Sequence, residues 1–553
     1  MALNLPLKKI LTEPSIPREH STVVYKEGSH VYAKDEKGSI ICQDSPTACI
    51  KESVYYLKNL GGGRVFIKRG TYIINEEIYL DGGPQFDLKN ILIEGESGTL
   101  LKRNDNVNKP VITISQAENI TVKGLSIDGN KQNNNQGAAI VLWKAKNAVI
   151  KHNYIFNSIT GIMANPQGGF DGPVFYMFNR LEQIGLNGSG DAMNAFGVNN
   201  VFVIGNYAEY TSGDTGFAGI GSRHVVCCNT FINGMVGVYF GTASGSSDSI
   251  MSDNVVYGGL YGAIIQNPSN RILISNNTFI SNKLKLIDIL NNIKIEGNVI
   301  YGSVSLEKTS NITIKGNYIT NDDTETCIST KWGSGNMENI YITGNILTKC
   351  KNGIVIDTGT DPSGVDFFTK YLVISGNVIT RNQLSGIVLL RTKYAFIREN
   401  YIGENCQSSD CTNPALSMWK VYNAEIINNM FFDYQDTKTQ TKGIAASNIE
   451  DIKILDNIFT NQTTPISVSG TRIIIKRNSG YTTENSGVAS ITANSTRVTV
   501  SHGLNNAPSK VLITPLGVPP GKLWVENITN TSFDIVTDTA PATNLPVAWY
   551  AEV

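Results

Sequence analysis

Apolar and polar residues alternate in short runs along most of the chain, and one run recurs almost letter for letter. NITIKGNYIT (Asn311–Thr320) reappears as NIKIEGNVIY, NIYITGNILT and YLVISGNVIT at residues 292–301, 339–348 and 371–380. In each copy the alternating positions lead to a Gly-Asn pair, and another apolar residue stands two places after the asparagine. Alternation of this kind predicts strands with one buried face.

The asparagine of this run can be followed through the chain at a regular interval. The first and last positions are 325 residues and thirteen steps apart, so the mean step is 25 residues. Such a step, with each unit a short β-rich run, predicts an all-β solenoid, the parallel β-helix. We expect these asparagines to point inward and to pair amide to amide at a spacing of about 4.8 Å. They are Asn153, Asn179, Asn206, Asn229, Asn254, Asn277, Asn298, Asn317, Asn345, Asn377, Asn400, Asn429, Asn457 and Asn478.

A short amphipathic helix is predicted ahead of the coils. Asp44 or Ser45 suits its N-cap, and Pro46 suits its first turn. The apolar residues that then fall on one helical face are Cys49, Ile50, Val54 and Leu57. Such a helix would cover the open end of the solenoid, whose strand edges would otherwise recruit other chains.

Four regions follow from these patterns. Residues 1–43 form an arm without strong periodicity that could attach the protein to something larger, and residues 44–110 hold the helix and the first coils. Residues 111–481 form the parallel β-helix. Residues 482–553 contain about six short strands separated by Pro, Gly and Asn turns, which predicts a small β-sandwich with His502 in a turn.

Several segments resemble a known superfamily. The helix, GGGRVFIKRGTYII (residues 61–74) and IEGESGTLL (Ile93–Leu101) resemble the opening of pectate-lyase-like β-helix proteins, which include polygalacturonases and viral tailspikes. The resemblance covers about residues 44–480 and implies a right-handed parallel β-helix. The C-terminal segment resembles small domains of viral tail and fibre proteins that aid trimerisation or bind glycans. A homotrimer that contacts other virion tail proteins is therefore implied.

Composition narrows the class of function. The 553 residues carry a net charge of −1, which gives no indication of nucleic-acid binding. No apolar run is long enough to predict membrane insertion. The first twenty residues lack the apolar core of a signal peptide, so we expect the virion surface to be reached by assembly. Export of a cellular enzyme by another route is the alternative, with an extracellular location.

The eight cysteines leave the compartment open. Cys42–Cys49 and Cys406–Cys411 are spaced for disulfides, and buried free thiols are an equal alternative. The adjacent Cys227 and Cys228 are expected on opposite faces of a strand.

The repeat asparagines also serve as a ruler, which places two pairs of carboxylates on neighbouring coils. Asp191 and Asp214 each lie fifteen residues before a repeat asparagine, and Glu182 and Glu209 each lie three residues after one. We expect both pairs to stack and the glutamates to face outward. Like charges about 5 Å apart raise each other's pKa, so such stacking requires a proton, a cation or a function.

Three interpretations of this cluster stay open. In the first, Asp191, Asp214, Glu182 and Glu209 are catalytic residues of an endo-acting glycoside hydrolase, where a protonated acid acts beside an ionised partner, with a lyase as the alternative. In the second, each Ser-Gly-Asp segment is a turn whose aspartate caps backbone amides. In the third the carboxylates hold calcium; otherwise no metal or cofactor is expected.

The position of the aspartates is similar to that in polygalacturonases, where aspartates at the starts of successive strands line the cleft. The chain departs from that family: residues 212–222 contain one aspartate in place of a pair, and residues 233–242 contain no histidine. Arg223, with His224, is a candidate for a cation near the cleft. Asp322-Asp323 is the second choice for the catalytic position.

Trp143, Trp332 and Trp419 are candidate substrate-binding residues, because each ends or follows a predicted strand. A flat ring beside polar side chains can stack on the apolar face of a pyranose. Core packing is the alternative for each. The overall prediction is a tailspike that binds and hydrolyses host surface polysaccharide or a glycoprotein glycan. A non-catalytic receptor-binding spike and a cellular polysaccharide lyase or hydrolase stay open.

Overall fold

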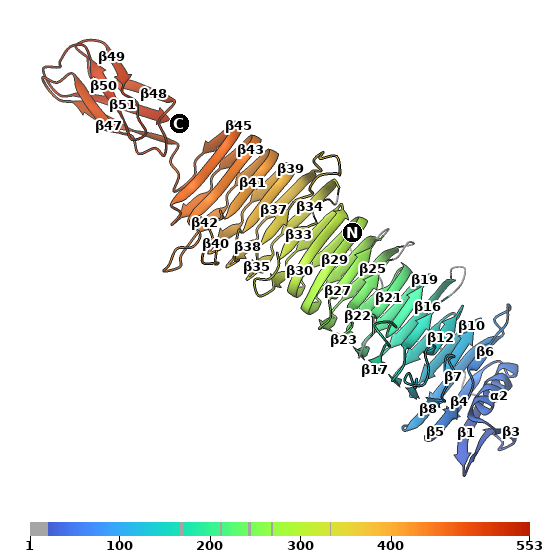
Figure 1. Ribbon diagram of the computed structural model, residues 1–553. Helices are drawn as coiled ribbons and strands as arrows, with labels where there is room; N and C mark the ends of the chain where they lie inside the picture. The colour runs from blue at the N-terminus through green and yellow to red at the C-terminus, as the bar shows by residue number, and fades with distance from the viewer. Residues whose placement is uncertain are drawn as a thin grey trace. The chain divides into compact units, whose positions relative to one another are not determined.

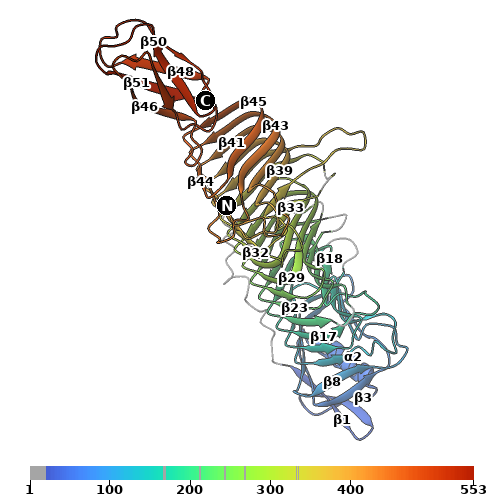
Figure 2. The same ribbon diagram turned by 60° about the vertical axis from the view of Figure 1, so that its left-hand side comes forward.

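A computed structural model of the protein describes residues 20–165, 170–210, 213–241, 245–266, 269–331, 333 and 335–553. The chain divides into two compact units, Met1–Ile319 and Thr320–Val553. Nearly every element is a strand, and both units are built on coils of a right-handed parallel β-helix (Figures 1 and 2). The predicted fold class is therefore confirmed.

The first unit begins with three short strands, β1 (Ser21–Glu27), β2 (His30–Asp35) and β3 (Ile40–Asp44). β1 and β2 pair antiparallel, and β1 also pairs in parallel with β4 (Gly63–Ile67), which starts the coils. Residues 21–44 thus belong to the folded end of the solenoid, although the sequence suggested an arm there. The reason is that their alternate apolar side chains are buried, with Val24 and Ala33 fully so.

The predicted capping helix is α2 (Pro46–Asn59), which lies beside β1, β3 and β4 (Figure 1). Ser45 is its N-cap, and the Ser45 hydroxyl accepts the Ala48 N–H at 3.2 Å. The four residues predicted for its apolar face are at most 1% exposed. The helix therefore covers the end of the solenoid as expected.

In the first unit a coil contains three strands, and each strand pairs with the one three places along the chain. For example, β11 (Ser126–Asp128) pairs in parallel with β14 (Tyr154–Phe156), and β14 with β17 (Arg180–Ile184). Inward side chains then stack coil upon coil into a continuous core. One such row, at most 2% exposed throughout, contains Ile155, Leu181, Ala208, Phe231, Val256 and Phe279.

The repeat asparagines form the predicted amide ladder. From Asn153 to Asn317 in the first unit, each side-chain amide donates to the side-chain oxygen of the next asparagine at 2.9–3.1 Å. From Asn345 to Asn478 in the second unit the same bonds measure 2.9–3.0 Å. These asparagines are at most 8% exposed, so the ladder satisfies polar groups that the core would otherwise leave unpaired.

The second unit ends in two three-stranded antiparallel sheets. β46 (Glu484–Ile491), β51 (Leu545–Glu552) and β48 (Lys510–Pro515) form one sheet. The other contains β47 (Arg497–Ser501), β50 (Ser532–Thr537) and β49 (Leu523–Glu526). Their shared apolar core includes Phe533, Val547 and Trp549, which is the predicted sandwich. His502 is fully buried beside this core, where its Nδ1 accepts the Leu504 N–H at 3.0 Å.

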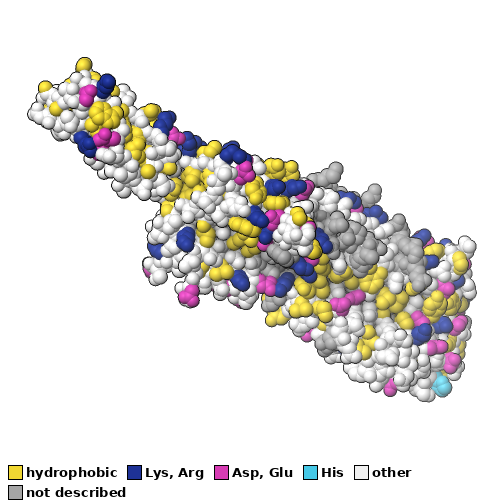
Figure 3. All heavy atoms as spheres, turned by 45° about the horizontal axis from the view of Figure 1, so that its top comes forward, with side chains coloured by type: hydrophobic (Ala, Val, Ile, Leu, Met, Phe, Trp, Pro, Cys, Tyr) yellow, Lys and Arg dark blue, Asp and Glu magenta, His cyan; other side chains and the backbone are white. Residues whose placement is uncertain are grey.

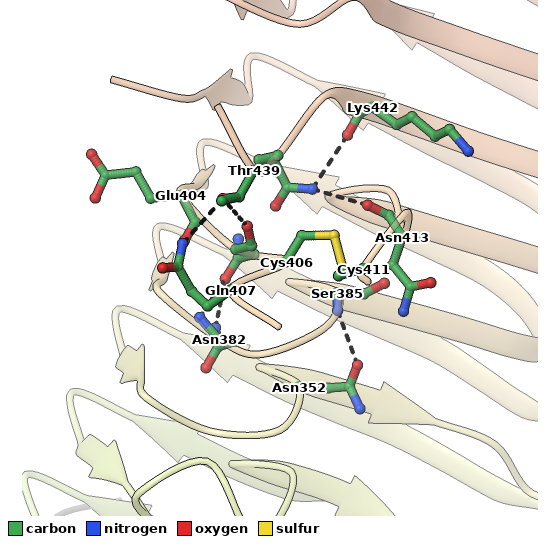
Figure 4. The surroundings of a disulfide bond; sticks show 12 residues. Asn352, Asn382, Ser385, Glu404, Cys406, Gln407, Cys411, Asn413, Thr439 and Lys442 are labelled. Carbon is green, nitrogen blue, oxygen red and sulfur yellow. Dashed lines mark hydrogen bonds between the residues drawn. A yellow bond between two sulfur atoms is a disulfide. The ribbon is translucent and has the colours of Figure 1, made fainter. Parts of the chain in front are cut away.

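Three disulfides tie turns of the coils and the capping region: Cys42–Cys49, Cys327–Cys350 and Cys406–Cys411. Figure 4 shows the Cys406–Cys411 bridge among turn residues of successive coils. Cys227 and Cys228 are free, and their sulfurs are 3.3 Å apart. They are on the same side of the chain, contrary to expectation, because Cys228 follows the end of β22 (Val225–Cys227) with a φ of 60°.

Lys, Arg, Asp and Glu side chains are interspersed on the face that Figure 3 shows, as expected from the near-zero net charge. Among the residues that the structure describes, no helix is long and apolar enough to cross a membrane.

Candidate functional site

The two candidate aspartates lie at the starts of neighbouring strands in the first unit. Asp191 precedes β18 (Met193–Phe196), and Asp214 precedes β21 (Thr215–Ser222). The Asp214 N–H donates to the Gly190 carbonyl at 3.1 Å, and the Ala192 N–H donates to the Thr215 carbonyl at 2.9 Å. The backbones around both carboxylates are therefore held in adjacent coils.

The register differs by one residue from the one that the asparagine ruler predicts. Met193 pairs with Phe217, 24 residues later, so Asp191 is level with Thr215 and not with Asp214. The two carboxylates are still close enough for the charge of Asp214 to act on Asp191. The structure thus brings the aspartates together with a stagger.

Burial raises the pKa of Asp191 to about 6. Hydrogen bonds from the Asn194 amide, at 3.0 Å, and from Thr215 lower the pKa, and the charge of Asp214 raises it. Burial also raises the pKa of Asp214. Asp191 therefore keeps a proton for part of the time near neutral pH, as a general acid requires.

Two tyrosines complete the surroundings of the aspartates. The hydroxyl of buried Tyr210 donates to the Thr215 carbonyl at 2.9 Å. Burial raises the pKa of Tyr210 well above its usual value, and the charge of Asp191 adds to this. The Tyr239 hydroxyl donates to Gln266 Oε1 at 2.5 Å, and burial and then the Asp214 charge raise its pKa. Both phenols therefore stay protonated.

Tyr239 and Asn194 belong to one outward row across three coils, although the sequence did not single them out. Asn194 of β18 pairs with Ala218 of β21, and Ala218 pairs with Tyr239 of β24 (Val236–Phe240). The small Ala218 leaves room between the two larger side chains. Asn194, three residues after Asp191, carried a local signal, but Tyr239 requires the coil register to be known.

Glu182 and Glu209 lie on a different sheet from the aspartates, on the outer faces of β17 and β20 (Tyr207–Tyr210). Burial opposes ionisation of Glu182, but hydrogen bonds from Tyr154, at 2.7 Å, and Arg180 lower its pKa overall. The Tyr207 hydroxyl donates to Glu209 at 2.8 Å. Glu182 is thus held ionised, which suits hydrogen bonding to hydroxyl groups better than general-acid catalysis.

Arg223 and His224 lie at the opposite end of β21 from Asp214. The Arg223 guanidinium donates to Asn200 Oδ1 at 2.6 Å, on a neighbouring turn. His224 is fully buried, and its Nε2 is 2.7 Å from the carbonyl of Val198, the first residue of β19 (Val198–Ile204). Burial lowers the pKa of His224 to about 4, so it is neutral at pH 7 and supplies no cation to the aspartates.

The three candidate tryptophans have different surroundings. Trp143 ends β12 (Ala138–Trp143) and is partly exposed. Trp332 lies outside the described residues. In the second unit, Arg391 and Lys420 approach the ring of Trp419, at 5.0 and 4.6 Å from its centroid.

The cations beside Trp419 belong to an ion-pair network. Arg391 pairs with Asp357 at 2.6 Å and with Asp366 at 2.7 Å, and Lys420 pairs with Asp366 at 2.6 Å. Much of the Trp419 ring is therefore in contact with the protein's own side chains.

Asp322 and Asp323, the second choice for the catalytic position, occupy a turn with φ of 50° and 67°. Burial, followed by the charge of Asp322, raises the pKa of Asp323. Within the described ranges no group of three or more His, Cys, Asp or Glu side chains is placed to hold a metal ion.

Comparisons with known proteins agree with the fold. Residues 334–506 match the family described as "Periplasmic copper-binding protein (NosD)". A search of curated protein sequences gives no significant match. Among solved structures, a variant of the tailspike protein of E. coli bacteriophage HK620 in complex with a pentasaccharide is similar at 12% identity and a TM-score of 0.47, covering 94% of this chain and 92% of that one. The Azotobacter vinelandii mannuronan C-5 epimerase AlgE6 A-module is similar at 12% identity and a TM-score of 0.26, covering 79% and 95%.

Proposed function

We propose that the protein is a virion tailspike that binds a host surface polysaccharide along its coils and hydrolyses it at Asp191 and Asp214. The observation that carries the proposal is the staggered aspartate pair, in which one carboxyl has a pKa of about 6. Two carboxyl groups with different protonation states are what glycosidic hydrolysis requires.

In this mechanism each aspartate has one role. Protonated Asp191 donates its proton to the glycosidic oxygen as the bond to the anomeric carbon breaks. Ionised Asp214 acts on the opposite side, either by taking a proton from the attacking water or by attacking the anomeric carbon itself. Asn194 holds the Asp191 carboxyl in place through its 3.0 Å hydrogen bond.

The test measures release of reducing ends from a panel of purified bacterial capsular and O-antigen polysaccharides. We expect Asp191→Asn and Asp214→Asn each to lower the rate by about 100-fold or more. Above pH 6 the wild-type rate should fall as Asp191 loses its proton. Asp253→Asn is the matched control, because Asp253 is an exposed turn residue at a φ of 56°, which asparagine also tolerates.

Glu182→Gln and Glu209→Gln test the second carboxylate pair in the same assay. Loss of cleavage in these variants, with full activity in Asp191→Asn and Asp214→Asn, would move the catalytic site to β17 and β20. Binding without cleavage by the wild-type protein would favour a purely adhesive spike. Unsaturated products would identify a lyase, and occurrence of the protein only outside virus particles would identify an exported cellular enzyme.

An exposed apolar strip supports the proposed homotrimer. In the second unit one outward residue on each of five successive short strands is apolar, and parallel pairing aligns them along the coils. They are Ile346, Val378, Tyr401, Met430 and Ile458. Four of the five are 37–55% exposed, and contiguous apolar surface of this kind marks interaction sites. Light scattering should give three chains per particle, and Tyr401→Asp should lower that number.

A further inference from the structure

Two tyrosines of the second unit adopt a backbone conformation that neighbouring coils fill with asparagine. Tyr371 and Tyr394 have φ of 56° and 58°. The parallel register places them in one row with Asn339 and Asn423, whose φ values are 57° and 56°. Asparagine tolerates the left-handed region, whereas a bulky side chain is strained there. Backbone conformation alone therefore favours asparagine at both tyrosine positions.

The tyrosine rings form a stacked and exposed pair. Their centroids are 5.2 Å apart with an angle of 12° between the planes, and the residues are 48% and 41% exposed. This distance is close to the spacing of about 4.8 Å between neighbouring strands, so the flat faces point along the solenoid. Phe396, two residues after Tyr394 in β39 (Ile387–Arg398), is a third ring on this face and is 41% exposed.

A cavity of about 160 Å³ opens beside Phe396. It is lined by Phe396, Arg398, Glu399, Glu425, Ile427 and Asn428. Glu425 accepts a hydrogen bond from Lys453 at 2.8 Å. In the described parts of the chain, no hydrogen bond or ion pair engages the side chain of Arg398 or Glu399. The cavity thus combines an aromatic ring with a charged donor and a charged acceptor that are available to a ligand.

We propose that Tyr371, Tyr394, Phe396, Arg398 and Glu399 form a saccharide-binding surface, here named the tyrosine face. Sugar rings stack on the aromatic side chains through their C–H faces, and their hydroxyl groups accept from Arg398 and donate to Glu399. The inference rests on the proposed polysaccharide binding and deepens it, since it assigns binding to a surface separate from the cleaving aspartates.

The size and charge of the cavity restrict the ligand further. Pockets that enclose a whole small ligand measure about 300–1,000 Å³, so this one takes a single ring of a chain that continues along the surface. Arg398 and Lys453 are balanced by Glu399 and Glu425, so the local field does not favour a polyanion. The ligand class is therefore a polysaccharide with neutral units. Sugar hydroxyls suit this surface because each can donate and accept.

The experiment uses the full-length protein on an array of bacterial capsular and O-antigen polysaccharides. The binding variant is Tyr371→Asn/Tyr394→Asn, which restores the residue that the neighbouring coils use. We expect at least a tenfold loss of binding, with an equal or higher melting temperature and an unchanged oligomeric state. Arg398→Gln should also weaken binding. Tyr434→Asn is the matched control, since Tyr434 is 55% exposed and stacks on Phe432.

The outcomes separate this inference from the proposed hydrolysis. Asp191→Asn should abolish cleavage and keep binding, whereas the double tyrosine variant should raise KM and leave kcat unchanged. Unchanged array binding in the double variant overturns the tyrosine face, and so does a fall in melting temperature that accounts for the lost binding. Dissociation of the oligomer with unaltered binding per chain would show that this face contacts another copy. A wild-type protein that binds no polysaccharide overturns both proposals.

Discussion

Replacing one internal asparagine of the ladder by alanine tests how much the ladder stabilises the coils. Asn400 is a suitable position because it is fully buried in the second unit. Its amide donates to the Ile374 carbonyl and to Asn429 Oδ1, both at 2.9 Å. Its Oδ1 accepts from the backbone N–H of Asn377 at 3.0 Å and from the Asn377 side-chain amide at 2.9 Å.

The expected cost follows from the groups that Asn400→Ala leaves without partners. They are the Ile374 carbonyl, the backbone N–H of Asn377 and one N–H of the Asn377 amide. Each unpaired buried group costs about 1–3 kcal/mol, so the variant should lose about 3–6 kcal/mol, with a water molecule in the vacated space offsetting part of the sum. If these bonds are broken in the transition state for unfolding, the unfolding rate rises by about 100-fold or more.

The assay is the unfolding rate in guanidinium chloride, followed by tryptophan fluorescence. Rates are preferable to an equilibrium free energy, since a solenoid of this length is not expected to unfold in a single step. Thr380→Ala is the control, because Thr380 is on the outer side of the neighbouring short strand β38 (Val378–Thr380). If Asn400→Ala unfolds no faster than Thr380→Ala, the ladder is not what holds the coils together.

Three further predictions concern charge and covalent links. Folding stability should fall by about 3 kcal/mol as the pH drops from 6.5 to 4, because the unfolded chain protonates His224 while the folded one, with a pKa of about 4, does not; His224→Leu should remove this part of the pH dependence in thermal melts. Asp191 has a raised folded pKa, so its ionised form destabilises the fold above pH 6 and not below pH 4; Asp191→Asn should raise the melting temperature at pH 8 but not at pH 4, and a gain at both would contradict the sign. Cys327→Ser/Cys350→Ser opens a link between residues 23 apart and should cost about 3 kcal/mol, with reduction of the wild-type protein producing the same shift in melting temperature.

The repeat and the capping helix could be predicted from sequence because their signals are local. An inward asparagine needs only the apolar residue two places on to fix its side of the strand, and the whole ladder follows. The helix is specified by Ser45, Pro46 and a single apolar face. Residues 21–44 were harder, since short edge strands bury few side chains and carry a weak periodic signal. The tyrosine face was missed because its strain is visible only in backbone angles.

The stagger of the aspartates shows why a ruler based on one ladder cannot place a site on another sheet. Strands β17 and β20 pair residues 27 apart, β18 and β21 pair residues 24 apart, and β19 and β22 pair residues 23 apart. The step between coils therefore changes within one coil, because the turns between its strands differ in length. Counting back from the asparagines applies the last step to residues governed by the one before it, which misplaces Asp191 by one position. In a strand that slip would reverse the side chain, but Asp191 and Asp214 precede their strands, so their charges still interact.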